Sequence, residues 1–168
     1  MMIPEEHGGA GFDCVSYVIA IEEVSRACAS TGVILSVNNS LVCGPLLKFG
    51  NDDQKKRYLG PHARGEKIGA YCLTEPGAGS DSAALRTTAK KKGDTYVLNG
   101  TKVFVTNGEA ASTFLVYATV DPALKHKGIT AFLVERGFAG CRQGKPERKM
   151  GITCSGSTEM VLEDCEVP

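Results

Sequence analysis

The sequence has no net charge. Its 168 residues include 19 Lys and Arg and 19 Asp and Glu, which cancel at neutral pH. Binding to nucleic acid or to an anionic membrane depends on an excess of positive charge, so the composition supports neither partner. The one basic run, Lys90 to Lys92, precedes Gly93-Asp94 and is predicted to be the solvated end of a hairpin.

Paired cysteines are also missing. The seven cysteines are scattered without any C-x-x-C spacing, which argues against a zinc site and against a disulfide framework. An odd number of cysteines in a chain of this length suggests a reducing compartment. The first residues, M-M-I-P-E-E-H, lack the basic and apolar segments of a signal peptide. We therefore expect a protein that is not exported and holds no metal.

Neither of the commonest phosphate-binding motifs occurs, G-x-G-x-x-G or a loop ending in G-K-[ST]. The chain has instead Y-C-L-T-E-P-G-A-G-S-D at residues 71–81. Pro76, Gly77 and Gly79 exclude a helix and a regular strand, and the glycines allow backbone N–H groups to converge on an anion. On spacing alone, both a phosphate-binding loop enclosing Glu75 and an ordinary Gly/Pro turn remain open.

The segment before this loop is predicted to be helical. Asp13 can cap a helix over Cys14 to Ala29, and Val15, Val18 and Ile19 supply an apolar stripe that requires a packing partner. A second helix, Gly32 to Phe49, is apolar almost all round, which is typical of a helix inside a bundle.

Polar and helix-breaking residues interrupt that second helix. The Asn38-Asn39-Ser40 centre and a predicted break at Gly44-Pro45 argue against a membrane span. Asn51 and Gln54 have the spacing of a capping box for a third helix, which is predicted to end before Pro61.

After Lys67 the pattern indicates strands. Asn99-Gly100 is the dipeptide typical of a type I′ hairpin turn. Short strands separated by turn residues favour a compact antiparallel barrel or sandwich. The predicted strands are Ile68 to Leu73, Arg86 to Lys91, Thr95 to Leu98, Lys102 to Thr106, Thr113 to Thr119, Thr130 to Val134 and Thr158 to Leu162.

Several motifs, in order, resemble the acyl-CoA dehydrogenase family. L-T-E-P-G-A-G-S-D at 73–81 is similar to the family signature, and the resemblance continues through N-G-T-K-V-F-V-T-N-G at 99–108. It covers the whole chain, from P-E-E-H-G-G-A-G to E-D-C-E-V-P. The stretch S-V-N-N-S-L-V-C-G-P at 36–45 is most similar to short-chain, butyryl-CoA-type members.

The resemblance implies an α+β fold in which a helical bundle segment precedes an antiparallel β-barrel or sandwich. Residues 1–67 would be part of the family's N-terminal helical domain, and residues 68–168 would be its middle β-domain. The family's C-terminal helical domain has no counterpart here, so we expect a fragment. Because the family's catalytic base comes from that domain, no catalytic residue is expected in this chain, which should be inactive alone.

In the family, FAD lies across the β-domain, and a hydride passes from the acyl-CoA β-carbon to flavin N5 while a glutamate takes the α-proton. The resemblance implies that residues 71–74 line the flavin edge, and that Gly79 and Ser80 contact the cofactor. Ser80 would also lie near the substrate, although a turn hydroxyl bonded to its own backbone is the alternative. The residues that would line the flavin edge are Tyr71, Cys72, Leu73 and Thr74.

The other implied cofactor contacts are Phe104, Val105 and Thr106. Alternate positions of one strand share a face, so Phe104 and Thr106 would lie side by side. The resemblance implies that Thr106 hydrogen-bonds flavin N5 and that Phe104, where many members carry Trp, packs on the ring. Without the resemblance, Phe104 would be a core residue and Thr106 an ordinary strand residue.

The other candidate residues are expected to have structural or surface positions and no part in catalysis. Glu75 is expected to serve the loop's structure and not to be the base. His7, His62 and His126 match no catalytic position and are predicted to lie at the surface. Thr153 stands where the family often has Arg, which removes any guanidinium contact from that position.

The resemblance implies FAD-dependent dehydrogenation of a short-chain acyl-CoA to the trans-2-enoyl-CoA, by a protein of which this chain is a fragment lacking the catalytic base. Two alternatives remain: a non-catalytic remnant or interaction module, and a related acyl-CoA oxidase or flavin monooxygenase. The resemblance further implies electron-transferring flavoprotein as oxidant, a homotetramer in the full-length family, and a bacterial cytoplasmic or mitochondrial matrix location.

Overall fold

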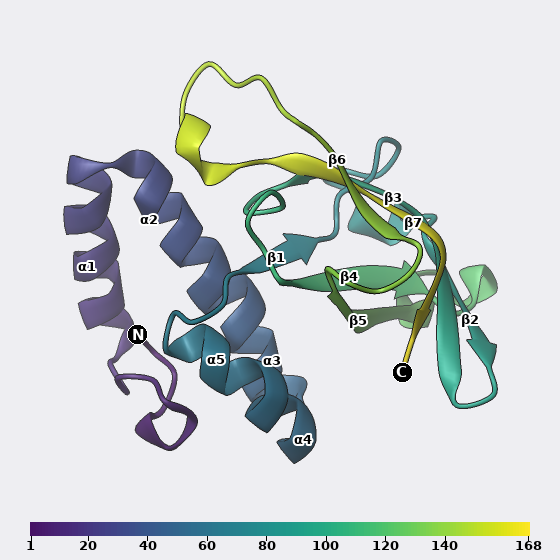
Figure 1. Ribbon diagram of the computed structural model, residues 1–168, viewed down its shortest axis with the longest axis horizontal. Coiled ribbons are helices and arrows are strands. Elements are labelled where there is room, and N and C mark those ends of the chain that lie inside the picture. Colours follow the sequence, from purple (N-terminus) through teal and green to yellow (C-terminus); the bar gives the residue numbers. More distant parts are fainter.

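A computed structural model describes residues 1–168. Figure 1 shows the helices gathered on one side of the molecule and a curled sheet on the other. The order of a helical segment followed by a β-domain, predicted from the sequence, is confirmed. The helices are α1 (Cys14–Ala27), α2 (Ala29–Ser36), α3 (Gly44–Phe49), α4 (Asp52–Gln54) and α5 (Gly60–Ala63), with π-helical segments at Val37–Cys43 and Lys55–Leu59.

Helix α1 begins as predicted, because the Asp13 carboxylate accepts a hydrogen bond from Ser16 N at 2.8 Å. Its predicted apolar stripe, however, is not packed. Val15, Val18 and Ile19 are all exposed, and Tyr17 is the buried residue of the helix. The expectation that the stripe finds a partner is therefore wrong for this structure.

The second predicted helix runs unbroken over Ala29–Phe49, through α2, the π-helical segment and α3. The predicted break at Gly44-Pro45 is wrong, because the chain stays helical through Pro45. The π-helical segment Val37–Cys43 lies directly before it, in the turn whose carbonyls lose the N–H donor that proline lacks. By length and composition these 21 residues could cross a membrane. The Asn38 side chain nevertheless bonds to other parts of the chain, and Val42 and Leu46 are buried in a small helical core.

The third helical run confirms the predicted capping box, in which Asn51 and Gln54 bond reciprocally. It does not end before Pro61, because Pro61 occupies the first turn of α5. His62, predicted to lie at the surface, is buried with 1% of its surface exposed. Its ring Nδ1 lies 3.1 Å from the Lys67 carbonyl oxygen, where the chain turns toward the sheet.

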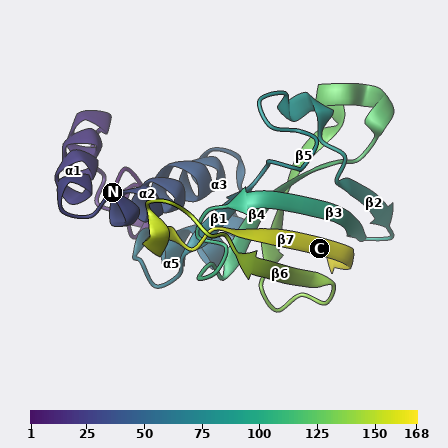
Figure 2. The same ribbon diagram turned by 90° about the horizontal axis from the view of Figure 1, so that it is seen from above.

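The sheet has seven strands in the order β1-β4-β2-β3-β7-β6, with β5 also paired to β4. Most pairs are antiparallel as expected, but β1 and β2 both run parallel to β4, so the sheet is mixed. Figure 2 shows it curling beside the helices without closing. The strands are β1 (Gly69–Cys72), β2 (Thr88–Lys92), β3 (Thr95–Val105), β4 (Thr113–Thr119), β5 (Ile129–Glu135), β6 (Cys141–Pro146) and β7 (Thr158–Val167).

The predicted hairpin at Asn99-Gly100 is wrong, because both residues lie inside the single long strand β3. The pairing register with β7 shifts at this point, and a Cβ added to Gly100 would come within 2.8 Å of Thr87 Cα. This glycine therefore permits close backbone approach and does not form a turn. The actual hairpin joins β2 to β3 through Gly93-Asp94, which confirms the solvated hairpin end predicted after Lys92.

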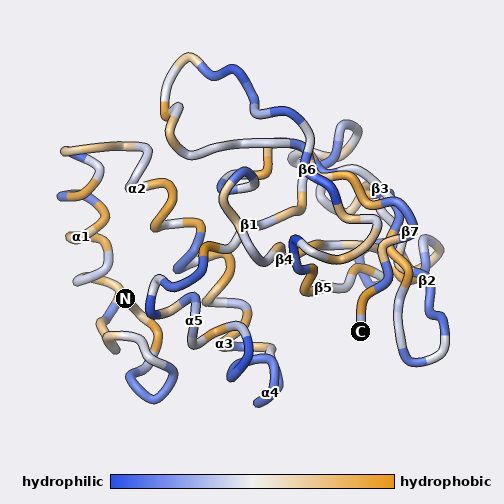
Figure 3. Tube along the Cα trace, viewed as in Figure 1, coloured by the Kyte–Doolittle hydropathy of each residue, from blue (hydrophilic) through white to orange (hydrophobic).

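Strand β6 was not predicted, since its sequence C-R-Q-G-K-P is polar and contains Gly and Pro. It lies at the sheet edge, where such residues are tolerated. The main core lies against β3, β4 and β7 and includes Leu98, Phe114 and Met160. Figure 3 shows hydrophobic stretches along the strands of the β-domain.

Candidate functional site

The glycine-rich loop after β1 is built around one tight turn. Glu75 and Ala78 exchange backbone hydrogen bonds in both directions, at 3.0 and 3.1 Å, which closes the chain over Pro76-Gly77. Gly77 and Gly79 are exposed, and a Cβ added to either would meet no atom within 4 Å. The loop thus presents bare backbone to its surroundings.

The Glu75 side chain points inward and is held from three directions. One carboxylate oxygen accepts from Arg86 N at 2.6 Å, and the other from Thr87 N at 2.9 Å and Lys102 Nζ at 2.7 Å. Lys102 is fully buried, and Glu75 has only 7% of its surface exposed. The structural role predicted for Glu75 is confirmed by these contacts.

Burial acts to raise the pKa of Glu75, but the hydrogen bonds from Lys102, Thr87 and Arg86 outweigh it, so the pKa lies below its ordinary value. This carboxylate is therefore ionised at neutral pH and already fully engaged. Sequence reasoning missed its partner. The available signal was the inward position of Lys102 on β3, because a buried cation requires a buried acid.

The same lysine fixes the loop against the end of β3. Lys102 Nζ also donates to the Leu73 carbonyl oxygen at 3.1 Å, and Val103 N donates to the Thr74 carbonyl oxygen at 2.9 Å. The structure consequently brings together the two segments singled out in the sequence, residues 71–74 and residues 104–106.

The nine candidate cofactor residues differ in what they expose. The side chains of Cys72 and Val105 lie in the main core, so only their backbone atoms can reach a ligand. Those that keep exposed or partly exposed surface are Tyr71, Leu73, Thr74, Gly79, Ser80, Phe104 and Thr106.

Several polar groups along this surface have no partner within the chain. The N–H groups of Gly79 and Ser80 make no hydrogen bond to the protein, and neither do the N–H or hydroxyl groups of Thr74 and Thr106. Backbone amides in a glycine loop suit a phosphate, and hydroxyls with adjacent amides suit the polar edge of a flavin ring. The residues present fit a flavin dinucleotide.

Phe104 has an unusual backbone for a bulky residue. Its φ is 55°, in the left-handed region, and a register shift between β3 and β7 falls between Lys102 and Val105. The regular alternation that placed Phe104 and Thr106 on one face is therefore interrupted, and Thr106 lies just beyond the strand. Phe104 keeps 67% of its surface exposed. Strain of this kind is concentrated at functional sites.

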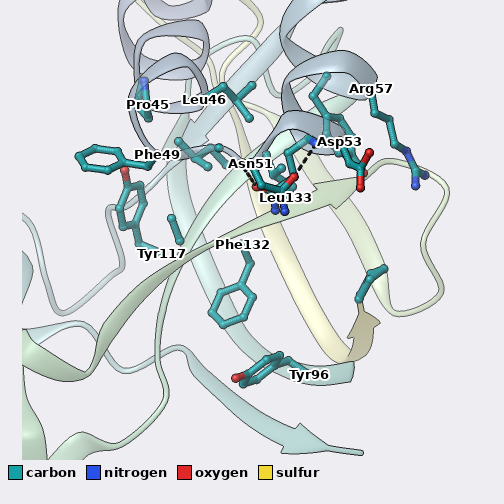
Figure 4. Close-up of a pocket in the computed structure, with 16 residues that line it drawn as sticks. Pro45, Leu46, Phe49, Asn51, Asp53, Arg57, Tyr96, Tyr117, Phe132 and Leu133 are labelled. Atoms are coloured by element: carbon teal, nitrogen blue, oxygen red, sulfur yellow. Dashed lines mark hydrogen bonds between the residues drawn. The ribbon is translucent and has the colours of Figure 1, made fainter. Parts of the chain in front are cut away.

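A separate cavity lies elsewhere in the molecule. It has a volume of about 630 Å³ between α3, α4 and the outer faces of β4 and β5, and Figure 4 shows Leu46, Phe49, Tyr117 and Leu133 among its lining residues. None of the candidate cofactor residues lines it. Tyr71 approaches it indirectly, because its ring packs on Tyr117 with the centroids 5.1 Å apart.

Residues 70–165 match the family model described as "Acyl-CoA dehydrogenase, middle domain", and residues 1–66 match "Acyl-CoA dehydrogenase, N-terminal domain". The short-chain specific acyl-CoA dehydrogenase of Homo sapiens mitochondria is 53% identical over 168 residues, which is 100% of this chain and 41% of that protein.

Solved structures of similar fold include acyl-CoA dehydrogenases. Butyryl-CoA dehydrogenase from Megasphaera elsdenii has a TM-score of 0.95 and 43% identity over 99% of this chain and 45% of its own. A chain from the structure described as "Electron transferring flavoprotein of Acidaminococcus fermentans" has a TM-score of 0.98 and 49% identity, over 100% and 44%. Acyl-CoA dehydrogenase complexed with FAD from Bacillus anthracis has a TM-score of 0.90 and 42% identity, over 99% of this chain and 28% of its own. The chain spans less than half the length of each.

Proposed function

Because this chain belongs to the acyl-CoA dehydrogenase family, we propose that it carries the flavin-binding part of an enzyme that dehydrogenates short-chain acyl-CoA thioesters to trans-2-enoyl-CoA. Residues 1–67 would belong to the N-terminal helical domain and residues 68–168 to the middle β-domain. FAD, when bound, supplies the acceptor for the hydride removed from the substrate.

The observation that carries the proposal is the junction of the glycine-rich loop with the end of β3. Two hydrogen bonds hold these segments together, Val103 N to Thr74 O and Lys102 Nζ to Leu73 O. Donors without a partner in the chain lie on both segments, at Thr74 and at Thr106. A rigid frame with free donors is what a protein needs in order to orient a planar cofactor and its substrate.

Five of the nine candidate residues would have a specific role within this frame. Thr106 would donate to the flavin at N5, Thr74 would bond the pyrimidine edge, and Phe104 would cover the ring. Ser80 and the Gly79 amide would bind the pyrophosphate, with Ser80 also close to the acyl-CoA. Glu75 stays outside the chemistry because Lys102 and two backbone amides occupy its carboxylate.

Short acyl chains are favoured by the 53% identity to a short-chain specific dehydrogenase and by the likeness to butyryl-CoA dehydrogenase. Electron-transferring flavoprotein is the proposed oxidant, in line with the structure described for Acidaminococcus fermentans. Relatives are mitochondrial and bacterial, so we propose the mitochondrial matrix or the bacterial cytoplasm as the location. For the whole protein we propose a tetrameric assembly, as the family resemblance implies.

The test is anaerobic reduction of the FAD-loaded whole protein by butyryl-CoA, followed by absorbance and by identification of the thioester product. We expect bleaching of the flavin and formation of the trans-2-enoyl-CoA, with octanoyl-CoA reacting more slowly. Rapid reoxidation of the reduced protein by O₂ alone would favour an acyl-CoA oxidase. Absence of FAD binding would contradict the proposal and favour an interaction module.

A further inference from the structure

Thr106 is held in place by its neighbours and makes no hydrogen bond of its own. On one side, Val105 is buried in the core and its carbonyl oxygen accepts from Gly108 N at 3.0 Å. On the other side lies Asn107, which has 2% of its surface exposed. The position of the Thr106 hydroxyl therefore depends on how firmly these two residues are fixed.

Asn107 is the most extensively bonded of the residues around Thr106. Its N–H donates to the Ser155 carbonyl oxygen at 3.0 Å, and its own carbonyl oxygen accepts from Ala110 N and Ala111 N at 3.0 and 2.8 Å. Its side-chain amide donates to the carbonyl oxygens of Ile34 at 3.3 Å and Gly69 at 3.2 Å. These contacts reach helix α2, the start of β1 and the loop before β7.

The backbone of Asn107 explains why asparagine suits this position. Its φ is 66°, in the left-handed region, which asparagine tolerates better than most residues with a side chain. Glycine would adopt the conformation as readily but would make neither side-chain bond. The residue thus combines a turn at the end of β3 with a tether to two other elements.

The tether at Gly69 is shared with a second asparagine. Gly69 N donates to Asn38 Oδ1 at 2.9 Å, while Gly69 O accepts from Asn107 Nδ2. Asn38 belongs to the helical segment, and its own amide donates to the His62 carbonyl oxygen at 3.1 Å. The backbone of one residue at the start of β1, Gly69, is therefore held through its N–H by Asn38 on the helical side and through its carbonyl oxygen by Asn107 on the sheet side.

We propose that Asn107 is a positioning residue that fixes Thr106 relative to β1 and to helix α2, and so aligns both segments that contact the flavin; this rests on the proposed function. Strand β1 leads directly into Leu73 and Thr74, and Asn107 directly follows Thr106. A tether from one to the other sets the spacing between the donors on the two segments. Misplacement by about 1 Å is enough to weaken such an arrangement strongly.

The test compares two variants that each remove two side-chain hydrogen bonds and that both release Gly69. Asn107→Gly keeps the left-handed backbone, and Asn38→Ala keeps the helix. We expect both to lower the melting temperature of the whole protein. Only Asn107→Gly should weaken FAD binding, by about tenfold, and alter the absorption spectrum of the bound flavin. Equal effects of the two variants on FAD affinity would mean a purely structural role and would overturn the proposal.

Amide hydrogen exchange without added FAD gives a second measurement, which decides the positioning claim separately from the cofactor. Exchange at Asn107 and Gly108 should rise at least about tenfold in Asn107→Gly and stay unchanged in Asn38→Ala. Unchanged exchange in Asn107→Gly would overturn the positioning role even if FAD binds. If the unmodified protein fails to bind FAD while exchange behaves as expected, the proposed function fails and the tether stands.

Discussion

Lys102 Nζ lies 2.7 Å from Glu75 Oε1, and the two side chains are 0% and 7% exposed. Breaking a buried ion pair by removing one partner leaves an uncompensated charge in the interior, which is strongly destabilising. This pair also closes the glycine-rich loop against β3, so its loss affects both the fold and the candidate site.

We predict that Lys102→Met lowers the free energy of unfolding by about 3–5 kcal/mol, measured by urea denaturation. Lys92→Met is the matched control, because Lys92 pairs with Glu166 at 3.1 Å on the surface, where an ion pair adds little. The control should be nearly neutral. If the two variants lose stability equally, the Glu75 carboxylate is not buried as described.

Acid should weaken the same contact. The pKa of Glu75 is lower in the folded protein than its ordinary value of 4.5, so its contribution to stability is full above that value and is lost as the pH falls through the folded-state pKa. Wild type should therefore lose stability more steeply than Glu75→Gln below about pH 4.5. Urea unfolding at several acidic pH values measures both slopes. Parallel slopes would show that Glu75 has no depressed pKa.

The sequence predicted local features well and long-range partners poorly. The Asp13 cap, the Asn51–Gln54 capping box and strand β4 follow from residues close together in the chain, and all three are found. The Asn99-Gly100 hairpin failed because pairing with β7 and contact with Thr87 override the local turn preference.

The candidate site was predictable in part for the same reason. The loop at residues 71–81 stands out by its glycines and its resemblance to a family signature. Lys102 and Asn107 were missed because their partners lie 27 and 38 residues away, at Glu75 and Gly69. His62 was misjudged because the Gly-Pro before it suggested a loop, whereas the helical run continues through it into the interior.

Phe104 should show a trade-off between stability and cofactor binding. Its left-handed backbone is unfavourable for a bulky side chain, and its exposed ring contributes little packing. Phe104→Gly should therefore raise the free energy of unfolding by about 1 kcal/mol while weakening FAD binding. Chemical denaturation and flavin titration test the two effects separately. A variant that loses stability and keeps its FAD affinity would contradict both roles.

The measurement that tests the central claim most directly is the rate of flavin reduction by butyryl-CoA in Thr106→Val, followed by stopped-flow absorbance in the FAD-loaded whole protein. Thr101→Val is the matched control, because Thr101 lies on β3 but outside the candidate site. Loss of the hydrogen bond to N5 should slow reduction by about tenfold or more, while Thr101→Val reacts like wild type. A Thr106→Val protein that is reduced as fast as the control would show that the end of β3 is not where the hydride is received.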